Sequence, residues 1–275
     1  MMDISDLKIR ILISFSGGES SAFMLIQLWN RYKNRLDVEI LVCFANTGDE
    51  EEETLIFVEK VSKVYSIPVT WLEAYVSPVM GLGVMPVIVD FDIASRDGAP
   101  LLDQSEKVGA CGISTPHCTR DLKIRCIQKY AKAYFEKQPF YTAMGMRFDE
   151  QIRIDWDRAN RERFIYPLVN TFRVYKADVR TYWRKHKEKY GWRLNLQPHQ
   201  GNCVLCHKKE ERKLVRLIRE KPCRAIFRMT LTLVSATDEY DMYRGHCDIW
   251  DLLEKAKSDT PEDLFSSFGG SCFCG

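Results

Sequence analysis

The sequence contains no long apolar run and has almost no net charge. No run reaches the roughly 18 apolar residues of a transmembrane helix, and the short apolar run after the charged residues 3–10 cannot form a signal-peptide core. The 40 Lys and Arg residues against 38 Asp and Glu give a net charge of +2, which does not indicate nucleic acid as a partner, although an average can hide a local patch. We expect a cytoplasmic protein without membrane association.

Internal repeats and low-complexity tracts are also absent, whereas cysteine is abundant. The chain has ten cysteines in 275 residues. Structural disulfides are rare in a reducing compartment, so the cysteines indicate thiol chemistry or metal binding. Cys43 and Cys126 are exceptions, because they lie in an apolar strand and on a helix and are expected to be small buried core residues.

Strand and helix patterns alternate through the first part of the chain. Such alternation predicts an α/β fold, with an open parallel sheet, flanking helices and right-handed crossovers, of the Rossmann-like kind. The expected strands are 9–15, 38–44, 67–72, 141–146 and 164–168, and the expected helices are 21–32, 50–65 and 120–135.

Two regions depart from this alternation. Residues 75–117 are rich in glycine and proline and are expected to form a long irregular loop. Residues 171–275 are expected to be mostly helical, with helices at 176–190 and 208–219 and a cysteine-bearing tail. We therefore predict an α/β domain at 1–170 and a helical C-terminal region at 171–275.

The first expected strand leads into a glycine turn and a helix start. The first turn of a helix carries unpaired N–H groups and a partial positive charge, and glycine lets a phosphate approach the backbone. The loop is not a Walker P-loop, because it contains no Gly-Lys-Ser/Thr. The residues from strand end to helix start are Ser14, Phe15, Ser16, Gly17, Gly18, Glu19, Ser20 and Ser21.

The second expected strand ends in another polar loop, Phe44-Ala45-Asn46-Thr47-Gly48-Asp49-Glu50. In an open parallel sheet the ligand lies at the carboxyl ends of the strands, so the two loops are expected to lie side by side. Three further stretches follow in order, which are Cys118–Lys123, Gly145–Glu150 and Tyr166–Leu168. Together these motifs resemble those of the phosphoadenosine phosphosulfate reductase family, in the PP-loop superfamily of adenine nucleotide alpha-hydrolases, and in particular its phage and mobile-element branch. The resemblance covers residues 9–220.

The resemblance implies a binding site for an adenine nucleotide, either ATP or phosphoadenosine phosphosulfate, with magnesium as an optional ion. Arg120, Lys123 and Arg147 would act on the phosphates or sulfate as catalytic cations, although Arg120 and Lys123 could equally belong to a solvated helix face. Glu150 would help close the site or simply pair with Arg147 or Arg153. The phosphate contacts would come from Ser14, Ser16, Gly17, Gly18, Glu19, Ser20 and Ser21, the adenosine contacts from Phe44, Asn46, Thr47 and Gly48, and closure from Gly145.

The pair Cys203-x-x-Cys206 has the spacing of a metal or cluster ligand pair, or else is a reduced pair without metal. With Cys118 upstream, it resembles the iron–sulfur subset of the same family, which implies a [4Fe–4S] cluster ahead of zinc. The tail pair Cys272 and Cys274 is the favoured source of the remaining ligand. Cys111 is the other candidate, and Cys247 and His207 are less favoured.

Two departures from the family leave the reaction open. Ser20 stands where the pyrophosphatase loop has Asp, and the tail has no Glu-Cys-Gly-x-His motif. One alternative is a reductase, in which a tail thiolate attacks the sulfate of a phosphosulfate nucleotide and a thiol reductant releases sulfite. A second is an ATP-dependent adenylyltransferase, in which ATP adenylates an acceptor such as nucleic acid and pyrophosphate leaves. Sulfur carried by a cluster or a cysteine then displaces AMP, with a sulfur-donor protein as an optional partner. A third is a nucleotide-binding regulatory module without catalysis. The Arg-rich run 155–163 is expected to be an exposed loop, with substrate recognition as an alternative role.

Overall fold

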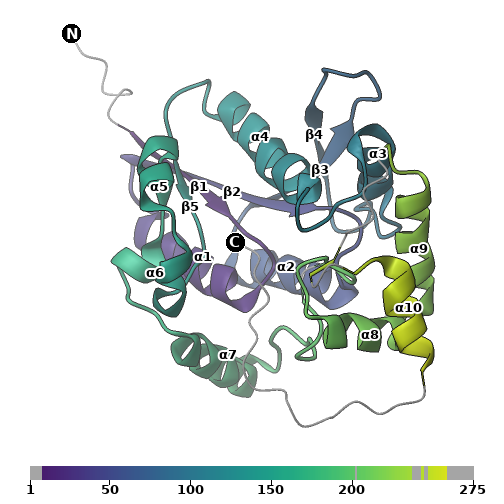
Figure 1. Cartoon of the computed structure of the whole chain (residues 1–275). Coiled ribbons are helices and arrows are strands. Elements are labelled where there is room, and N and C mark those ends of the chain that lie inside the picture. Colours follow the sequence, from purple (N-terminus) through teal and green to yellow (C-terminus); the bar gives the residue numbers. More distant parts are fainter. Residues whose placement is uncertain (1–7, 202, 237–242, 245–246, 259–275) are drawn as a thin grey trace.

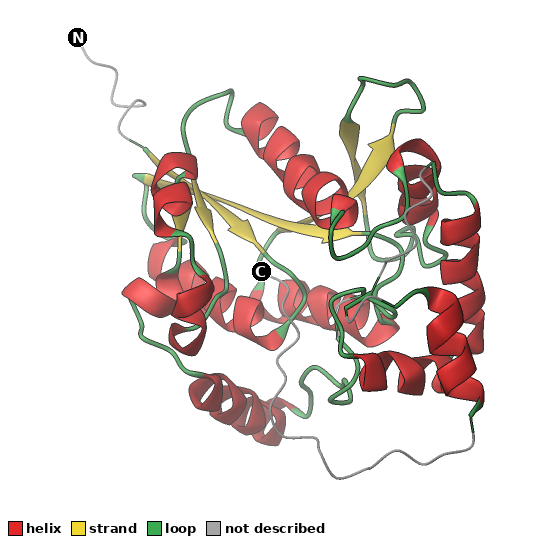
Figure 2. Ribbon diagram, in the orientation of Figure 1, coloured by secondary structure: helices red, strands yellow, loops and turns green. Residues whose placement is uncertain are grey.

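A computed structural model describes residues 8–201, 203–236, 243–244 and 247–258. Within these residues a six-stranded sheet has the order β4-β3-β2-β1-β5-β6, and its strands are parallel except for β4, which is antiparallel to β3 (Figures 1 and 2). The predicted α/β class and mostly parallel sheet are confirmed. The strands are β1 (Ile9–Ser14), β2 (Val38–Asn46), β3 (Val69–Val76), β4 (Val84–Val89), β5 (Tyr141–Ala143) and β6 (Phe164–Ile165).

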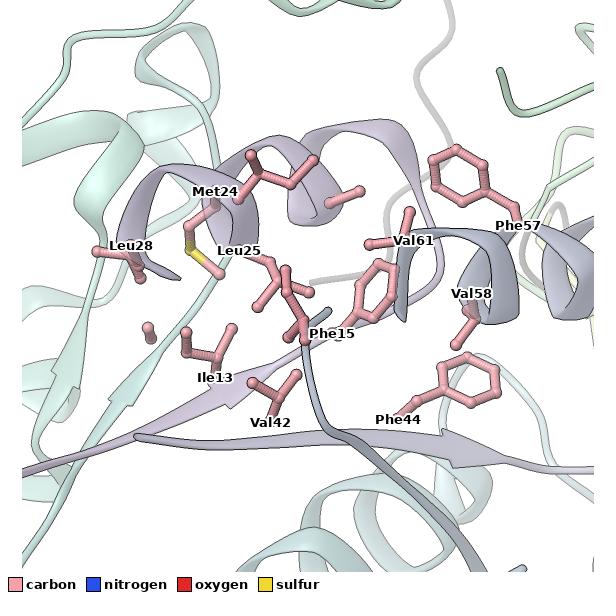
Figure 3. Packing of buried hydrophobic residues seen from close by; sticks show 14 of the residues in the cluster. Ile13, Phe15, Met24, Leu25, Leu28, Val42, Phe44, Phe57, Val58 and Val61 are labelled. Atoms are coloured by element: carbon pink, nitrogen blue, oxygen red, sulfur yellow. The ribbon is translucent and has the colours of Figure 1, made fainter. Parts of the chain in front are cut away.

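Helices cover both faces of the sheet, which explains why its central strands are nearly continuous apolar runs. In β1, Ile11 and Ile13 belong to one core and Leu12 to the other, as the alternation of a strand requires. The first core lies between the sheet and α1 (Glu19–Tyr32), α2 (Glu52–Tyr65) and α7 (Lys176–Tyr190), and Figure 3 shows its packing around Phe15 and Phe44. The second core lies under α3 (Ala99–Val108), the π-helix Cys118–Arg125 and α4 (Cys126–Tyr134).

The C-terminal part is helical, as expected. The helices α8 (Glu211–Glu220), α9 (Pro222–Leu233) and α10 (Ile249–Lys257) form a third core around Leu214, Leu217 and Ile249. Near the opposite edge of the sheet lie the 3-10 helix Phe148–Arg153, α5 (Trp156–Glu162) and α6 (Pro167–Asn170) (Figure 1). Helix α7 matches the expected range 176–190 at both ends.

Two regions expected to be irregular are ordered elements. Residues 75–117 contain β4 and α3. Pro86 obscured β4 in the sequence, because proline is tolerated in a strand only at an edge, which is where β4 lies. The expected loop 155–163 contains α5, whose N-cap Asp155 accepts a hydrogen bond from the Arg158 backbone N–H at 2.9 Å, and which ends at Arg163 with φ +57°.

Several predicted boundaries also differ. The predicted helix 120–135 is two consecutive segments, a π-helix from Cys118 and then α4, so it begins earlier and has a widened first part. The predicted strand 141–146 ends at Ala143, and the predicted helix 208–219 begins at Glu211 because the preceding residues form turns around Cys206.

Candidate functional site

The sheet has a topological switch point between β1 and β5. From β1 the chain proceeds to β2 and β3 on one side, whereas β5 and β6 lie on the other side. In open α/β sheets, ligands bind in the crevice at the carboxyl ends of the strands at such a point. The loop after β1 contains residues 15–18, and the loop after β5 contains Gly145, where an added Cβ would lie 2.8 Å from the Cα of Ser21. The two loops therefore pack directly against each other.

The loop after β1, with the first turn of α1, is the predicted phosphate site, and we call residues 14–21 the phosphate loop. The Ser16 and Ser21 hydroxyl oxygens lie 2.9 Å apart, and the Ser21 hydroxyl donates to the Gly18 carbonyl at 3.0 Å. Gly17 has φ +77°, and a Cβ there would lie 2.6 Å from Cγ2 of Thr54 on α2. The loop is thus held by its own serines and by α2, and it leads into the N-terminus of α1, where backbone N–H groups favour an anion.

Two arginines from distant parts of the chain flank this loop. Arg147, after β5, donates to the Ser20 hydroxyl at 2.9 Å and is held by Asp149 and Glu150, each 3.2 Å away. Arg193, after α7, pairs with Glu19 at 3.0 Å. Burial raises the pKa of Glu19, and Arg193 opposes that effect. Ser20, where the resembled family has Asp, is therefore a hydrogen-bond acceptor for a cation.

Sequence reasoning missed Arg193 because it is 174 residues from Glu19 and belongs to no recognised motif. Its position depends on α7. The Trp183 indole N–H donates to the Glu19 carbonyl at 2.9 Å, which fixes α7 beside the start of α1. Arg120, by contrast, makes two hydrogen bonds to Asp121, at 2.9 and 2.8 Å. Its role toward phosphate stays a prediction.

The loop after β2 is compact, and hydrogen bonds hold its polar side chains. The Asn46 amide donates to Glu73 at 2.6 Å and to the Ser95 carbonyl at 2.8 Å, and it accepts from the Gly48 N–H at 3.2 Å. Gly48 has φ +79°, which glycine adopts readily. Phe44, expected to flank adenosine, is buried and packs on Trp71 with ring centroids 4.8 Å apart. The side chains of Phe44 and Asn46 are thus buried at the carboxyl end of β2, and their predicted contact with adenosine stays a prediction.

Glu50 and Thr47 connect this loop to the cysteine motif. Glu50 accepts hydrogen bonds at 2.9 Å from both the backbone N–H and the hydroxyl of Thr47. The Cys203 sulfur lies 3.4 Å from the Thr47 hydroxyl and 3.7 Å from Glu50, and the Val204 N–H donates to the Asp49 carbonyl at 2.7 Å. The Cys-x-x-Cys segment therefore lies directly against the carboxyl end of β2.

Lys123, a predicted catalytic cation, joins this contact. Its ammonium lies 3.2 Å from Glu50 and 3.9 Å from the Cys203 sulfur. Burial alone would raise the pKa of Glu50, but Lys123 and the Thr47 hydrogen bonds hold it below its ordinary value. Lys123 thus serves the thiol side of the site.

Four buried cysteines from three segments converge here, and we call Cys111, Cys118, Cys203 and Cys206 the thiol cluster. The Cys118 N–H donates to the Cys111 sulfur at 3.1 Å. Burial raises the pKa of Cys203; the charge of Lys123 opposes that effect, and the charges of Glu50 and Cys206 add to it. The hydrogen bond to Cys111 and burial raise the pKa of Cys118, and Cys206 adds to that effect.

The structure places Cys111, the other candidate for the remaining ligand, beside Cys118. Cys272 and Cys274 lie outside the described residues, so their predicted role stays a prediction. Among the residues described, no three His, Cys, Asp or Glu side chains stand together in metal-binding geometry. Cys43 and Cys126 are buried in the second core, as expected.

Glu150 has both of the simpler partners considered for it, because it pairs with Arg147 at 3.2 Å and with Arg153 at 2.9 Å. The positions of the other predicted residues are as follows. Ser14 ends β1, Gly18 precedes α1, and His207 and Cys247 are buried near the third core.

Ion pairs that sequence reasoning missed join α8 and α9 to the loop after β2. Asp49 pairs with the buried Arg228 and lies 3.4 Å from Arg224, and Glu51 pairs with Lys221. With Glu50 and Lys123, three consecutive acids each hold a cation from another element, and we call Asp49, Glu50 and Glu51 the acidic triad. In the sequence these acids appear only as favourable charges at the start of α2.

None of the helices in the described ranges is both long and apolar enough to cross a membrane.

Comparison with known proteins gives a similarity to a phage protein. No protein family model matches the chain. Over 206 residues the chain is 29% identical to the "Uncharacterized nin region protein ORF290" of Escherichia phage lambda, a match that covers 74% of this chain and 67% of that protein. The similarity agrees with the phage part of the resemblance drawn from the motifs.

Proposed function

We propose that the chain is an enzyme that binds an adenine nucleotide at the phosphate loop and uses the thiol cluster for sulfur transfer or sulfonucleotide reduction. One observation carries the proposal. Cys203 contacts Thr47 and Glu50 at the carboxyl end of β2, next to the strand that leads into the phosphate loop. A candidate phosphate site and a sulfur-rich site therefore lie on neighbouring strand ends.

On the nucleotide side, the proposal assigns phosphate binding to backbone N–H groups at the start of α1 and to Arg147. Arg147 is 12% exposed and is oriented by Asp149 and Glu150. A guanidinium can bind two phosphate oxygens at once, and here Arg147 would do so by releasing the Asp149 carboxylate that its Nε and Nη2 contact. Its hydrogen bond to Ser20 places it at the helix N-terminus, where a phosphate group would lie. The optional magnesium would have to be brought by the nucleotide.

On the thiol side, the proposal is an iron–sulfur cluster, or zinc as the alternative; the thiols are the right type of donor, but among the described residues they do not stand in metal-binding geometry. Both take four cysteine thiolates, and Cys111, Cys118, Cys203 and Cys206 would supply them. When bound, a cluster would supply electrons or labile sulfide. The chain's own contribution is a set of buried thiols beside a fixed turn, in which the Lys209 ammonium donates to the Cys203 and Val204 carbonyls at 3.0 and 2.9 Å.

The first test is the composition of anaerobically purified protein. We expect iron and acid-labile sulfide, and we expect Cys203→Ala to lose both. The matched control is Cys43→Ala, which removes an equally buried thiol from the second core and should retain the metal. Wild-type protein without metal, or equal loss in both variants, would contradict the cluster.

The second test identifies the nucleotide and the reaction. ATP and phosphoadenosine phosphosulfate are compared by their protection against thermal unfolding, and then by product. Sulfite indicates a reductase with a thiol reductant, whereas pyrophosphate and AMP indicate adenylation and sulfur transfer. Tight nucleotide binding without either product would instead support a regulatory module, and the absence of nucleotide binding would refute the proposal.

A further inference from the structure

The chain is nearly neutral as a whole, but its charge is unevenly distributed. Residues 147–193 contain thirteen Lys and Arg residues against seven Asp and Glu. The rest of the chain contains 27 against 31. The excess of positive charge is therefore concentrated in the segment that forms α5, α6 and α7, which lie along one side of the molecule in Figure 1. A local concentration of this kind attracts polyanions even when the net charge is small.

Most of this charge lies on α7, whose exposed cations with Arg173 we call the basic face. The helix turns Val179, Trp183 and His186 into the protein. Along its exposed side one row of cations is spaced by four, four and three residues, from Lys176 to Lys187, and covers about 16 Å of the helix axis. Within the described part of the chain these cations form no ion pairs with carboxylates, unlike Arg147 or Arg153. The basic face consists of Arg173, Lys176, Arg180, Arg184, Lys185, Lys187 and Lys189.

The basic face begins beside the phosphate loop. Trp183 anchors α7 to the Glu19 carbonyl, and Arg193, just after the helix, pairs with the Glu19 side chain. Arg180 is near enough to act on the charge of Glu19. A polyanion bound along α7 would therefore reach the mouth of the candidate site.

Exposed aromatic rings accompany the cations. Tyr175 and Tyr190, at the two ends of α7, are 48% and 51% exposed. Interleaved cations and aromatic rings suit a nucleic-acid strand, since the cations bind phosphates and the rings stack on bases.

An anionic membrane fits this surface less well. A helix that lies on a membrane inserts an apolar face, whereas the apolar side of α7 is already packed in the first core. We propose that the basic face binds a nucleic-acid strand and leads it to the phosphate loop. The binding itself is independent of the proposed function, but the strand's role as the acceptor of the reaction rests on it.

The test is equilibrium binding of fluorescein-labelled strands as a function of salt. The probes are oligouridine and oligothymidine of equal length, a DNA duplex, and phosphatidylserine vesicles. The variant is Arg184→Gln with Lys185→Gln and Lys187→Gln. Each phosphate contact to a single strand contributes about 0.7 to the slope of log K against log salt, so the triple variant should lower the slope by about 2. If such contacts contribute nothing at 1 M salt, the triple variant should bind a strand on the order of 100-fold more weakly than the wild type at 0.1 M salt.

The matched control removes three exposed lysines elsewhere, namely Lys60, Lys132 and Lys137, which are outside the basic face. It should retain strand binding, and both variants should retain the nucleotide-induced rise in melting temperature. A preference for RNA or for DNA would support the proposal and identify the strand. Binding to vesicles alone, no binding to any strand, or equal loss in the two variants would overturn it. None of these failures affects the nucleotide-protection result, so failure of the proposed function is recognised separately.

Discussion

Replacing Arg228 by methionine tests whether the Asp49–Arg228 pair holds α9 to the loop after β2. Both side chains are almost fully buried, at 1% and 4% exposure. Removing one partner of a buried pair leaves an uncompensated charge and costs about 3–5 kcal/mol. Arg224 lies 3.4 Å from the other Asp49 oxygen and compensates in part, so we expect the lower limit, about 3 kcal/mol.

The assay is urea unfolding followed by tryptophan fluorescence. With a slope of about 3 kcal/mol per molar urea, the Arg228→Met midpoint should fall by about 1 M. Asp49→Asn should be destabilised to a similar extent, because it leaves Arg228 without its carboxylate. The double variant, Asp49→Asn with Arg228→Met, should then be about as stable as either single variant. That result corresponds to a coupling free energy between the two side chains of at least about 2 kcal/mol. A loss under about 1 kcal/mol for Arg228→Met, or simple additivity in the double variant, would refute the reasoning.

The remaining predictions concern the phosphate loop and acid stability. Gly17→Ala should lower the free energy of unfolding by about 1–3 kcal/mol, because Gly17 has φ +77° and its Cβ would meet Thr54 at 2.6 Å. Gly18→Ala, whose Cβ would make only an ordinary contact with the Ser16 hydroxyl at 3.8 Å, should melt like the wild type but bind nucleotide more weakly in calorimetry. Equal melting of the two variants would contradict the geometry. Burial would raise the pKa of Asp121, but hydrogen bonds and charges, chiefly from Arg120, lower it below the ordinary 3.8. Because this pKa is lowered, the carboxylate stabilises the fold above its ordinary pKa, and the stabilisation is lost as pH falls through the folded-state pKa. Below about pH 4 the urea midpoint of Asp121→Asn should therefore fall less than that of the wild type. Parallel midpoint-against-pH curves would contradict this.

Local sequence patterns were sufficient to predict most of the sheet. The apolar run 9–15 marks a strand covered on both faces, and Val179, Trp183 and His186 set the period of α7. Local patterns failed where a residue's meaning depends on its position in the sheet. Pro86 argues against a strand unless that strand is at the edge, and Asp155 reads as a loop residue until its side chain is seen to cap α5.

The order of the loops along the sheet was predictable, but the partners of the site were not. Strand-end loops at Ser16 and Thr47 were expected to be neighbours because parallel strands end at one edge. Nothing local indicates that Arg193 contacts Glu19, or that Cys111 lies beside Cys118. Such pairings depend on how α7 and the π-helix pack against the sheet, and that packing involves contacts distant in sequence.

The acidic triad has a consequence for how this chain can be divided. Asp49 and Glu51 lie in the α/β part, yet their cations Arg228 and Lys221 come from α9 and the residue before it. A fragment that ends near residue 170 would keep the buried carboxylates and lose these counter-charges. We therefore expect the α/β part and the helices after residue 210 to unfold together. A gene that exchanged one of them for an unrelated segment would also have to replace the acids after β2.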